Sequence, residues 1–146
     1  MNCPLCTTDG GLIVARTSRF RVVRVVEGDE ALRFPAFYRL IWSDHVAEFS
    51  DLPPADRHAC MDAVVGIERV LRSLLEPAKV NIASLGNVVP HLHWHVIARF
   101  GWDSHFPAPV WATAQRDVPG GAAARLRLPL EQVDEAVAQS LSSASR

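Results

Sequence analysis

Apolar and polar residues alternate in short runs over the first 42 positions of the chain. Three of these runs are rich in Val, Ile, Phe and Leu and have the length of β-strands. The strands cover Leu12–Ala15, Phe20–Val26 and Ala36–Trp42, with turns near Thr17-Ser18 and at the EGDE segment, Glu27–Glu30. Because each run follows the previous one after a turn, an antiparallel meander is the simplest topology.

Helical periodicity begins after position 50. The segment Ser50–Pro54 combines capping residues with prolines that are tolerated in a first turn, so it indicates a helix start. Apolar residues then recur at helical spacing: Cys60, Ala63, Val64, Ile67, Val70, Leu71 and Leu74. The pattern predicts one long helix that ends at about Leu75, with Cys60 on its core-facing side.

Two further strands and a last helix complete the predicted elements. The strands cover Lys79–Leu85 and His91–Phe100, with a turn at Gly86-Asn87. Pro129 opens a short C-terminal helix, in which the shared apolar face carries Leu130, Val133, Val137 and Leu141. The order predicts an α+β fold on an antiparallel sheet of about five strands. We expect residues 1–112 to form the domain and residues 113–146 a linker and a helix that packs on it.

The composition is that of an ordinary globular domain. Fifteen basic and sixteen acidic residues leave the chain almost neutral, which argues against a broad nucleic-acid footprint. Arginines are dense between Arg16 and Arg39, and we interpret them as strand faces turned to water, with a weak chance of contact with phosphates. No apolar run is long enough to cross a bilayer, and no secretory signal is visible. We therefore expect no membrane partner and a cytoplasmic location.

The stretch PHLHWHVIARF, Pro90–Phe100, places a histidine at every second position. In a strand, His91, His93 and His95 share one face. Leu92, Trp94 and Val96 occupy the other face, which we expect to pack against the long helix. Three interpretations are open. The histidines are ordinary exposed residues, or they are zinc ligands, or one imidazole is a nucleophile that its neighbours orient. Three histidines in register argue against the first.

Residues 91–97, His-Leu-His-Trp-His-Val-Ile, resemble the signature of the histidine triad (HIT) family of nucleotide hydrolases and transferases. Asn81 and the turn Gly86-Asn87 resemble the approach to the triad in that family. His45 falls where the family has its fourth histidine. The resemblance covers about Cys3–Phe100 and implies a HIT-like fold, of the zinc-containing bacterial type.

The resemblance also implies a chemistry. His93, as the middle histidine, is the expected nucleophile toward the α-phosphate of a purine nucleotide, forming a nucleotidyl-histidine intermediate. His95 is expected to stabilise charge on the phosphate oxygens, and Asn81 and Asn87 to bind substrate. Val88 stands where related hydrolases often carry a hydroxyl residue, which leaves the choice of substrate open.

The implied substrates are a dinucleoside polyphosphate or a nucleoside phosphoramidate, and the implied assembly is a homodimer whose subunits pair their sheets. The alternative is a catalytically weak nucleotide-binding or sensing module of the same fold. A metallohydrolase that uses the triad as zinc ligands is a third hypothesis.

The N-terminal Cys3-Pro4-Leu5-Cys6 has the spacing of half a zinc site. Some HIT proteins close such a site with the histidine after the third strand and the first histidine of the triad. The matching residues are His45 and His91, so the resemblance implies a structural zinc ion held by Cys3, Cys6, His45 and His91. The alternative keeps two free thiols at a loose terminus, with His45 orienting the active site.

The segment after the triad, Gly101–Trp111, is dense in aromatic residues and contains Asp103 and His105. It is placed either to lie over the site or across a dimer interface, or to cover the sheet edge as a hydrophobic loop. His105 is a candidate to support the catalytic histidines indirectly.

Overall fold

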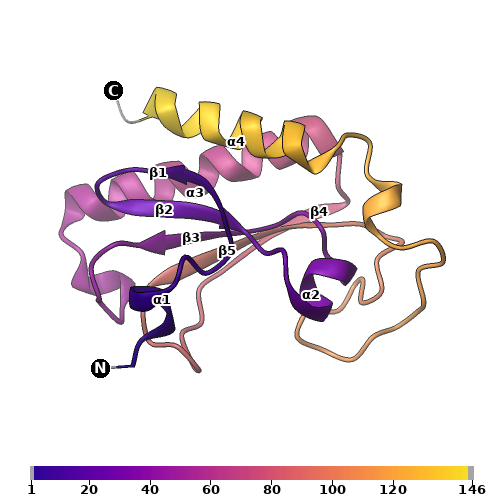
Figure 1. The fold of residues 1–146 in the computed structure, drawn as a ribbon, viewed down its shortest axis with the longest axis horizontal. Coiled ribbons are helices and arrows are strands. Elements are labelled where there is room, and N and C mark those ends of the chain that lie inside the picture. The colour runs from indigo at the N-terminus through magenta and orange to yellow at the C-terminus, as the bar shows by residue number, and fades with distance from the viewer. Residues whose placement is uncertain (1, 145–146) are drawn as a thin grey trace.

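A five-stranded antiparallel sheet forms the centre of the molecule (Figure 1). The computed structural model describes residues 2–144. The strands are β1 (Leu12–Arg16), β2 (Phe20–Arg24), β3 (Phe37–Trp42), β4 (Lys79–Ala83) and β5 (His93–Arg99). Their order is β1-β2-β3-β5-β4, so the histidine-bearing strand β5 lies inside the sheet between β3 and β4. The predicted α+β class and the initial meander are confirmed.

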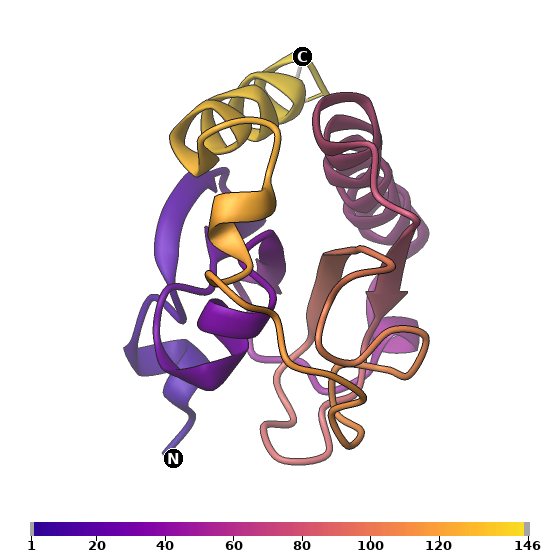
Figure 2. The same ribbon diagram turned by 90° about the vertical axis from the view of Figure 1, so that its right-hand side faces the viewer.

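Two long helices cover one face of this sheet and lie side by side (Figures 1 and 2). These two are α3 (Pro54–Leu75) and α4 (Leu130–Ala144). Two short helices, α1 (Pro4–Thr7) and α2 (Gly28–Arg33), and single 3₁₀ turns at Phe49–Asp51 and Ala123–Arg125 lie in the connections. The long helix ends at Leu75 as predicted, because Glu76 adopts a left-handed conformation with φ of 48°. The last helix has 15 residues and is longer than the short helix we expected.

The main core fills the space between the sheet and α3 and α4. Its side chains come from alternate positions of the central strands and from the apolar faces of both helices, among them Val22, Tyr38, Leu40, Cys60, Ile67, Leu71, Val96, Val133 and Val137. Leu92 and Trp94 also belong to this core, so the even-numbered side of the histidine segment faces the helices as predicted. The histidines therefore face away from α3 and α4.

The EGDE segment is not a turn. β2 ends at Arg24, and Gly28–Arg33 form the helix α2 before β3 begins. Helix formation is favoured because acidic side chains occupy the first turn and Arg33 pairs with Asp29 one turn earlier, at 2.6 Å. The expected hairpin between the second and third strands is thus replaced by a helical connection.

The predicted start of the last strand was also wrong by two residues. His91 and Leu92 precede β5, because Leu92 meets only the last residue of β3, Trp42, and His91 comes before it. Leu92 is bound to the end of β3 and to the segment that follows it: the Trp42 amide donates to the Leu92 carbonyl, and the Leu92 amide donates to the Val46 carbonyl. His91 is consequently free to turn toward the N-terminal segment.

The arginines of the early strands are only partly turned to water, so that interpretation was wrong for several of them. Arg21 is buried, and Arg24 is bound to Asp134 of α4 by Nε at 2.9 Å. The Tyr38 hydroxyl donates to the same carboxylate at 2.6 Å. These two contacts fix α4 on the sheet.

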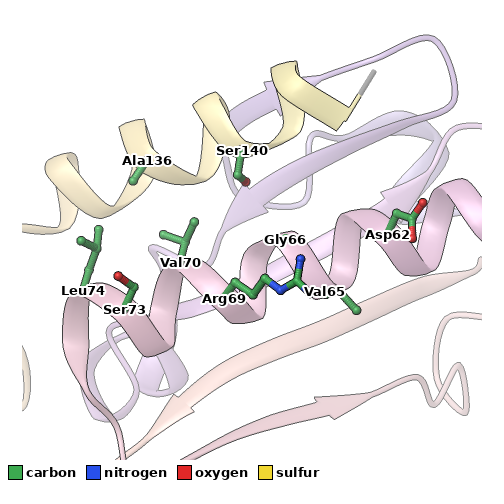
Figure 3. Close-up of a pocket in the computed structure, with 9 residues that line it drawn as sticks. All are labelled: Asp62, Val65, Gly66, Arg69, Val70, Ser73, Leu74, Ala136 and Ser140. Atoms are coloured by element: carbon green, nitrogen blue, oxygen red, sulfur yellow. The ribbon is translucent and has the colours of Figure 1, made fainter. Parts of the chain in front are cut away.

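A groove of about 660 Å³ runs between α3 and α4 (Figure 3). It is lined mainly by small and apolar side chains, including Val65, Gly66, Val70, Leu74 and Ala136. Because both helices lie on the sheet face opposite the histidines, this groove is separate from the histidine site. Within residues 2–144, no helix is both long and apolar enough to cross a membrane.

Candidate active site and metal centre

The second and third histidines of the triad lie together on the sheet face away from α3 and α4. His93 pairs with Ile41 and His95 with Arg39 in the β3–β5 ladder, so these four side chains share that face. The two imidazole rings are 5.0 Å apart and nearly perpendicular. The prediction that they point in one direction is confirmed.

One nitrogen of His93 is fixed by the backbone. Its Nδ1 lies 2.6 Å from the carbonyl oxygen of His91. A carbonyl only accepts hydrogen bonds, so Nδ1 carries the proton and Nε2 keeps its lone pair. Burial lowers the pKa of His93, and the charge of Arg39 adds to this effect, which favours the neutral ring. Such an imidazole has a free nucleophilic nitrogen.

His95 lies deeper, among aromatic rings. Its ring is 5.5 Å from Phe37 and 5.2 Å from Trp111, both in edge-to-face contact. Burial lowers the pKa of His95 to about 3, helped by the proximity of His93 and Arg39. Its Nδ1 is buried without a hydrogen-bond partner among the described residues. Unsatisfied buried nitrogens are uncommon and often mark functional sites.

The first triad histidine belongs to a different centre. The Nδ1 of His91 is 3.4 Å from the Sγ of both Cys3 and Cys6, and 3.2 Å from the Nδ1 of His45. The Cys6 Sγ is 3.3 Å from the same His45 nitrogen. All four donor atoms lie within 4.8 Å of one another. The predicted group of two cysteines and two histidines is therefore assembled.

The donor set and its spacing fit zinc. Tetrahedral zinc with bonds of about 2.0–2.3 Å requires ligand atoms about 3.3–3.8 Å apart, close to the distances above. The Nε2 of His91 donates to the Trp42 carbonyl at 2.6 Å, so Nδ1 is deprotonated and aimed at the centre. This is the backbone support that zinc-binding histidines usually have. Four protein donors make a closed site of the structural type.

Arg21 holds the cysteine segment against the sheet. Its guanidinium donates to the carbonyls of Leu5, Thr8 and Asp9 at 2.8–2.9 Å. Leu5 lies in helix α1, and Thr8 and Asp9 follow that helix, so the arginine anchors the segment that carries both thiols. Strand β2 thereby positions the two N-terminal cysteines of the metal centre.

A buried ion pair anchors the segment that follows the triad. Arg99 donates to Asp103 from Nε at 2.8 Å and from Nη2 at 3.1 Å, and both side chains are 2% exposed. The same arginine donates to Asn81 Oδ1 at 2.8 Å and to the Ala108 carbonyl at 2.7 Å. The chain is thus folded back so that Trp111 reaches His95. Of the two interpretations of this segment, the structure favours coverage of the site.

The remaining predicted site residues lie in different places. Asn81 on β4 takes part in the Arg99 network, whereas Asn87 is exposed in the connection between β4 and β5. Val88 beside it is 92% exposed. His105 is buried, in edge-to-face contact with Phe34 and within 2.8 Å of the Ser104 hydroxyl.

Sequence reasoning did not single out Phe37, Arg39 or Trp111, although all three surround His95. Phe37 and Arg39 are two residues apart on β3, the alternation that would place them on one face. Their alignment with His95 depends on the β3–β5 register, which no local pattern reveals. A cluster of aromatic residues was the only available sign of Trp111.

Comparison with known families and structures matches this geometry. The model of the HIT domain family matches residues 24–101, more than half of the chain. The chain therefore belongs to the HIT domain family, as the triad motif predicted. Comparison with the curated proteins finds no match.

Solved structures support the fold. A histidine triad protein from Bradyrhizobium japonicum is 24% identical, with a TM-score of 0.70 over 91% of this chain and 92% of that one. A histidine triad protein from Marinobacter aquaeolei VT8 is 21% identical, with a TM-score of 0.68 and coverage of 93% and 92%. A zinc-bound histidine triad family protein from Mycobacterium smegmatis is 18% identical, with a TM-score of 0.60 and coverage of 99% and 96%. The expected zinc site accordingly agrees with both the donor cluster and a zinc-bound protein of the same fold.

Proposed function

We propose that the protein is a nucleotide hydrolase or transferase in which His93 is the nucleophile. The observation that carries the proposal is the hydrogen bond from His93 Nδ1 to the His91 carbonyl, at 2.6 Å. It holds the ring in the tautomer whose Nε2 lone pair is free to attack phosphorus. A lowered pKa keeps that lone pair available at neutral pH.

The first step forms a bond from His93 Nε2 to the α-phosphorus and breaks the bond between that phosphorus and the leaving group. The electron pair departs with the leaving group, which takes up a proton. In the second step, water attacks the same phosphorus and gives up a proton, which balances the one taken up by the leaving group, and the P–N bond breaks, returning the pair to Nε2. Nδ1 keeps its proton throughout, because the His91 carbonyl accepts a hydrogen bond from it in both steps. The products are a nucleoside monophosphate and the protonated leaving group.

His95 is proposed to donate to the phosphate oxygens as charge develops on them. It lies beside His93 on the same strand, and its burial among aromatic rings lowers the local dielectric, which strengthens such a contact. Asn87 and the amide group of Asn81 are proposed to contact the substrate at the rim of the site.

The proposed substrates are dinucleoside polyphosphates or nucleoside phosphoramidates with a purine base. Both carry a nucleoside monophosphate joined to a leaving group through one bond at the α-phosphorus, so one mechanism serves both. We propose a cytoplasmic setting, in which the Cys3 and Cys6 thiols are kept reduced for metal binding.

The zinc ion is proposed to be structural. It would be held by Cys3, Cys6, His45 and His91, and it would fix the His91 segment, whose carbonyl accepts the hydrogen bond from His93 Nδ1. His93 and His95 are outside the cluster of donor atoms. Chelation is therefore expected to affect stability first and chemistry only through the position of the His91 carbonyl.

We propose a homodimer formed through the edge strand β4. The other edge, β1, packs against α4, whereas Ile82 on β4 and Leu85 after it are 38% and 49% exposed. An unpaired edge with apolar side chains is suited to pairing with a second copy. Light scattering of wild type and of Ile82→Lys tests this: a dimer that becomes a monomer supports it, and a monomeric wild type contradicts it.

Turnover of adenosine phosphoramidate and of diadenosine polyphosphates tests the function. Wild type is expected to release AMP, and His93→Ala is expected to lose at least 100-fold in kcat/KM, as for a lost nucleophile, with roughly 10²–10⁴-fold typical of a single catalytic group. His58→Ala, an exposed histidine on α3, is the matched control and should keep full activity. Equal rates for wild type and His93→Ala would refute the proposed mechanism and favour a nucleotide-binding module.

A further inference from the structure

Three arginines on the histidine-bearing face of β2, β3 and β5 differ in how their guanidinium groups are used. These are Arg21, Arg39 and Arg99. Arg21 donates to three carbonyls at 2.8–2.9 Å, and Arg99 donates four hydrogen bonds of 2.7–3.1 Å. Both are therefore committed to holding the fold.

Arg39 is different. Its Nη1 lies 3.3 Å from the Gly10 carbonyl and its Nη2 lies 3.5 Å from Glu30 Oε2, at the long end of hydrogen-bond distances. Its Nε is buried without an acceptor among the described residues. A guanidinium has five donor hydrogens, so most of the capacity of this one is unused. The Glu30 contact is an ion pair, but a long and partly exposed one, so among the described residues no short contact fixes the orientation of Arg39.

The position of Arg39 places this cation beside the proposed reaction centre. It is the cross-strand neighbour of His95, and its guanidinium lies 5.5 Å from the centre of the Phe37 ring, which also contacts His95. On its other side it lines a cavity of about 620 Å³ together with Gly10, Gly11, Glu27 and Glu30. That volume is within the usual range for small-molecule sites.

We propose that Arg39 is an anion-binding residue of the site and contacts the phosphate group of the bound nucleotide. A phosphate beside His93 and His95 would meet two imidazoles, and Arg39 is the arginine that lies directly opposite His95 and is held only by long contacts. Rotation of the Arg39 side chain toward the phosphate would exchange its present contacts, at 3.3 Å to the Gly10 carbonyl and 3.5 Å to the Glu30 carboxylate, for charge-assisted hydrogen bonds of ordinary length. The inference rests on the proposed function, since it takes that phosphate as the ligand.

Binding of AMP and of adenosine, measured by calorimetry, separates the phosphate from the nucleoside. Arg39→Met keeps most of the side-chain length and removes the charge, and it should weaken AMP binding by roughly 10- to 100-fold, the effect expected for charge-assisted hydrogen bonds. Adenosine affinity should be unchanged. Arg39→Lys should recover part of the AMP affinity, and added salt should weaken AMP binding less in Arg39→Met than in wild type.

Arg33→Met is the matched control, because Arg33 is an arginine of the neighbouring helix α2 that pairs with Asp29 at the surface. It should bind AMP like wild type. Thermal unfolding of each variant verifies that it is folded. If folded Arg39→Met binds AMP as tightly as wild type does, or loses adenosine affinity equally, the inference is overturned. Wild type that binds neither AMP nor inorganic phosphate would overturn it as well.

The same assays distinguish this inference from the proposed catalytic function. Loss of AMP affinity in Arg39→Met, with no turnover by wild type, would leave the anion site standing and remove the enzyme. Turnover that depends on His93, with unchanged AMP binding in Arg39→Met, would do the reverse.

Discussion

Replacing Asp103 with Asn is expected to destabilise the protein strongly, because it breaks a buried ion pair from one side. The carboxylate accepts from Arg99 Nε and Nη2, and also from the backbone amides of Phe100, His105 and Phe106 at 3.2, 3.0 and 2.7 Å. An amide offers only one acceptor oxygen, and the charge of the buried arginine is left uncompensated.

The magnitude follows from that geometry. Breaking a buried pair by removing one partner costs about 3–5 kcal/mol. For a protein of this size, each kcal/mol lowers Tm by about 2–4 °C, so the expected decrease is about 6–20 °C. Urea denaturation at pH 7 should show the same loss in the free energy of unfolding. Because the pair anchors the segment that carries Trp111, kcat/KM should fall as well.

The pH dependence has a definite sign. Burial alone would raise the pKa of Asp103, but hydrogen bonds from Arg99 and from the backbone amides of Phe100 and His105 outweigh it, and the net pKa is lowered. A lowered folded-state pKa contributes stability that is complete above the unfolded value of about 3.9 and is lost as pH falls through the folded value. The gap between wild type and Asp103→Asn should therefore be full at neutral pH and narrow below about pH 4.

Asp29→Asn is the matched control, since it breaks an exposed pair with Arg33 at the same i,i+4 spacing. Exposed helix pairs contribute about 0.3–0.5 kcal/mol, so Tm should hardly change. In a double-mutant cycle, the variant with both Arg99→Met and Asp103→Asn should lose less free energy of unfolding than the sum of the losses in the two single variants. If Asp103→Asn were no less stable than Asp29→Asn, the reasoning about this ion pair would be refuted.

The zinc site, the protonation of His95 and the contact of Trp111 with His95 can each be tested separately. Cys6→Ser should lower the zinc content measured by atomic emission and should decrease Tm. A chelator should decrease the Tm of wild type but not that of Cys6→Ser, and equal decreases in both proteins would contradict the zinc site. Because the pKa of His95 is lowered to about 3, NMR should find its ring neutral at pH 5, and an imidazolium there would contradict the burial argument. Trp111→Ala should raise KM with little change in Tm, since Trp111 is 48% exposed, and an unchanged KM would remove it from the site.

Much of the fold was readable because each element has its own periodicity. The helix face around Ile67 and the alternation from His93 to Ile97 specify which sides are buried. The helix α2 was missed because Gly28, Asp29 and Glu30 resemble a turn when read singly, and the stabilising pair with Arg33 appears only at helical spacing.

Part of the candidate site could likewise be predicted from the sequence and part could not. The triad and the Cys3–Cys6 pair were visible as motifs, and family resemblance joined them to His45. The residues around His95 could not be predicted. Arg39 lies opposite His95 because of the register between β3 and β5, and Trp111 contacts His95 because the buried Arg99–Asp103 pair folds the following segment back. Contacts made by non-local pairing leave no local pattern in the chain.

Covalent catalysis at His93 is tested by intact-protein mass spectrometry, which detects a nucleotidyl group on the protein. Wild type and His93→Ala are mixed with adenosine phosphoramidate or a diadenosine polyphosphate and quenched rapidly without acid, because phosphorus–nitrogen bonds are acid-labile. We expect a transient mass increase of one adenylyl group on wild type, mapped to the peptide containing His93, and none on His93→Ala. Turnover by wild type without any adduct, or an adduct that persists in His93→Ala, would contradict it.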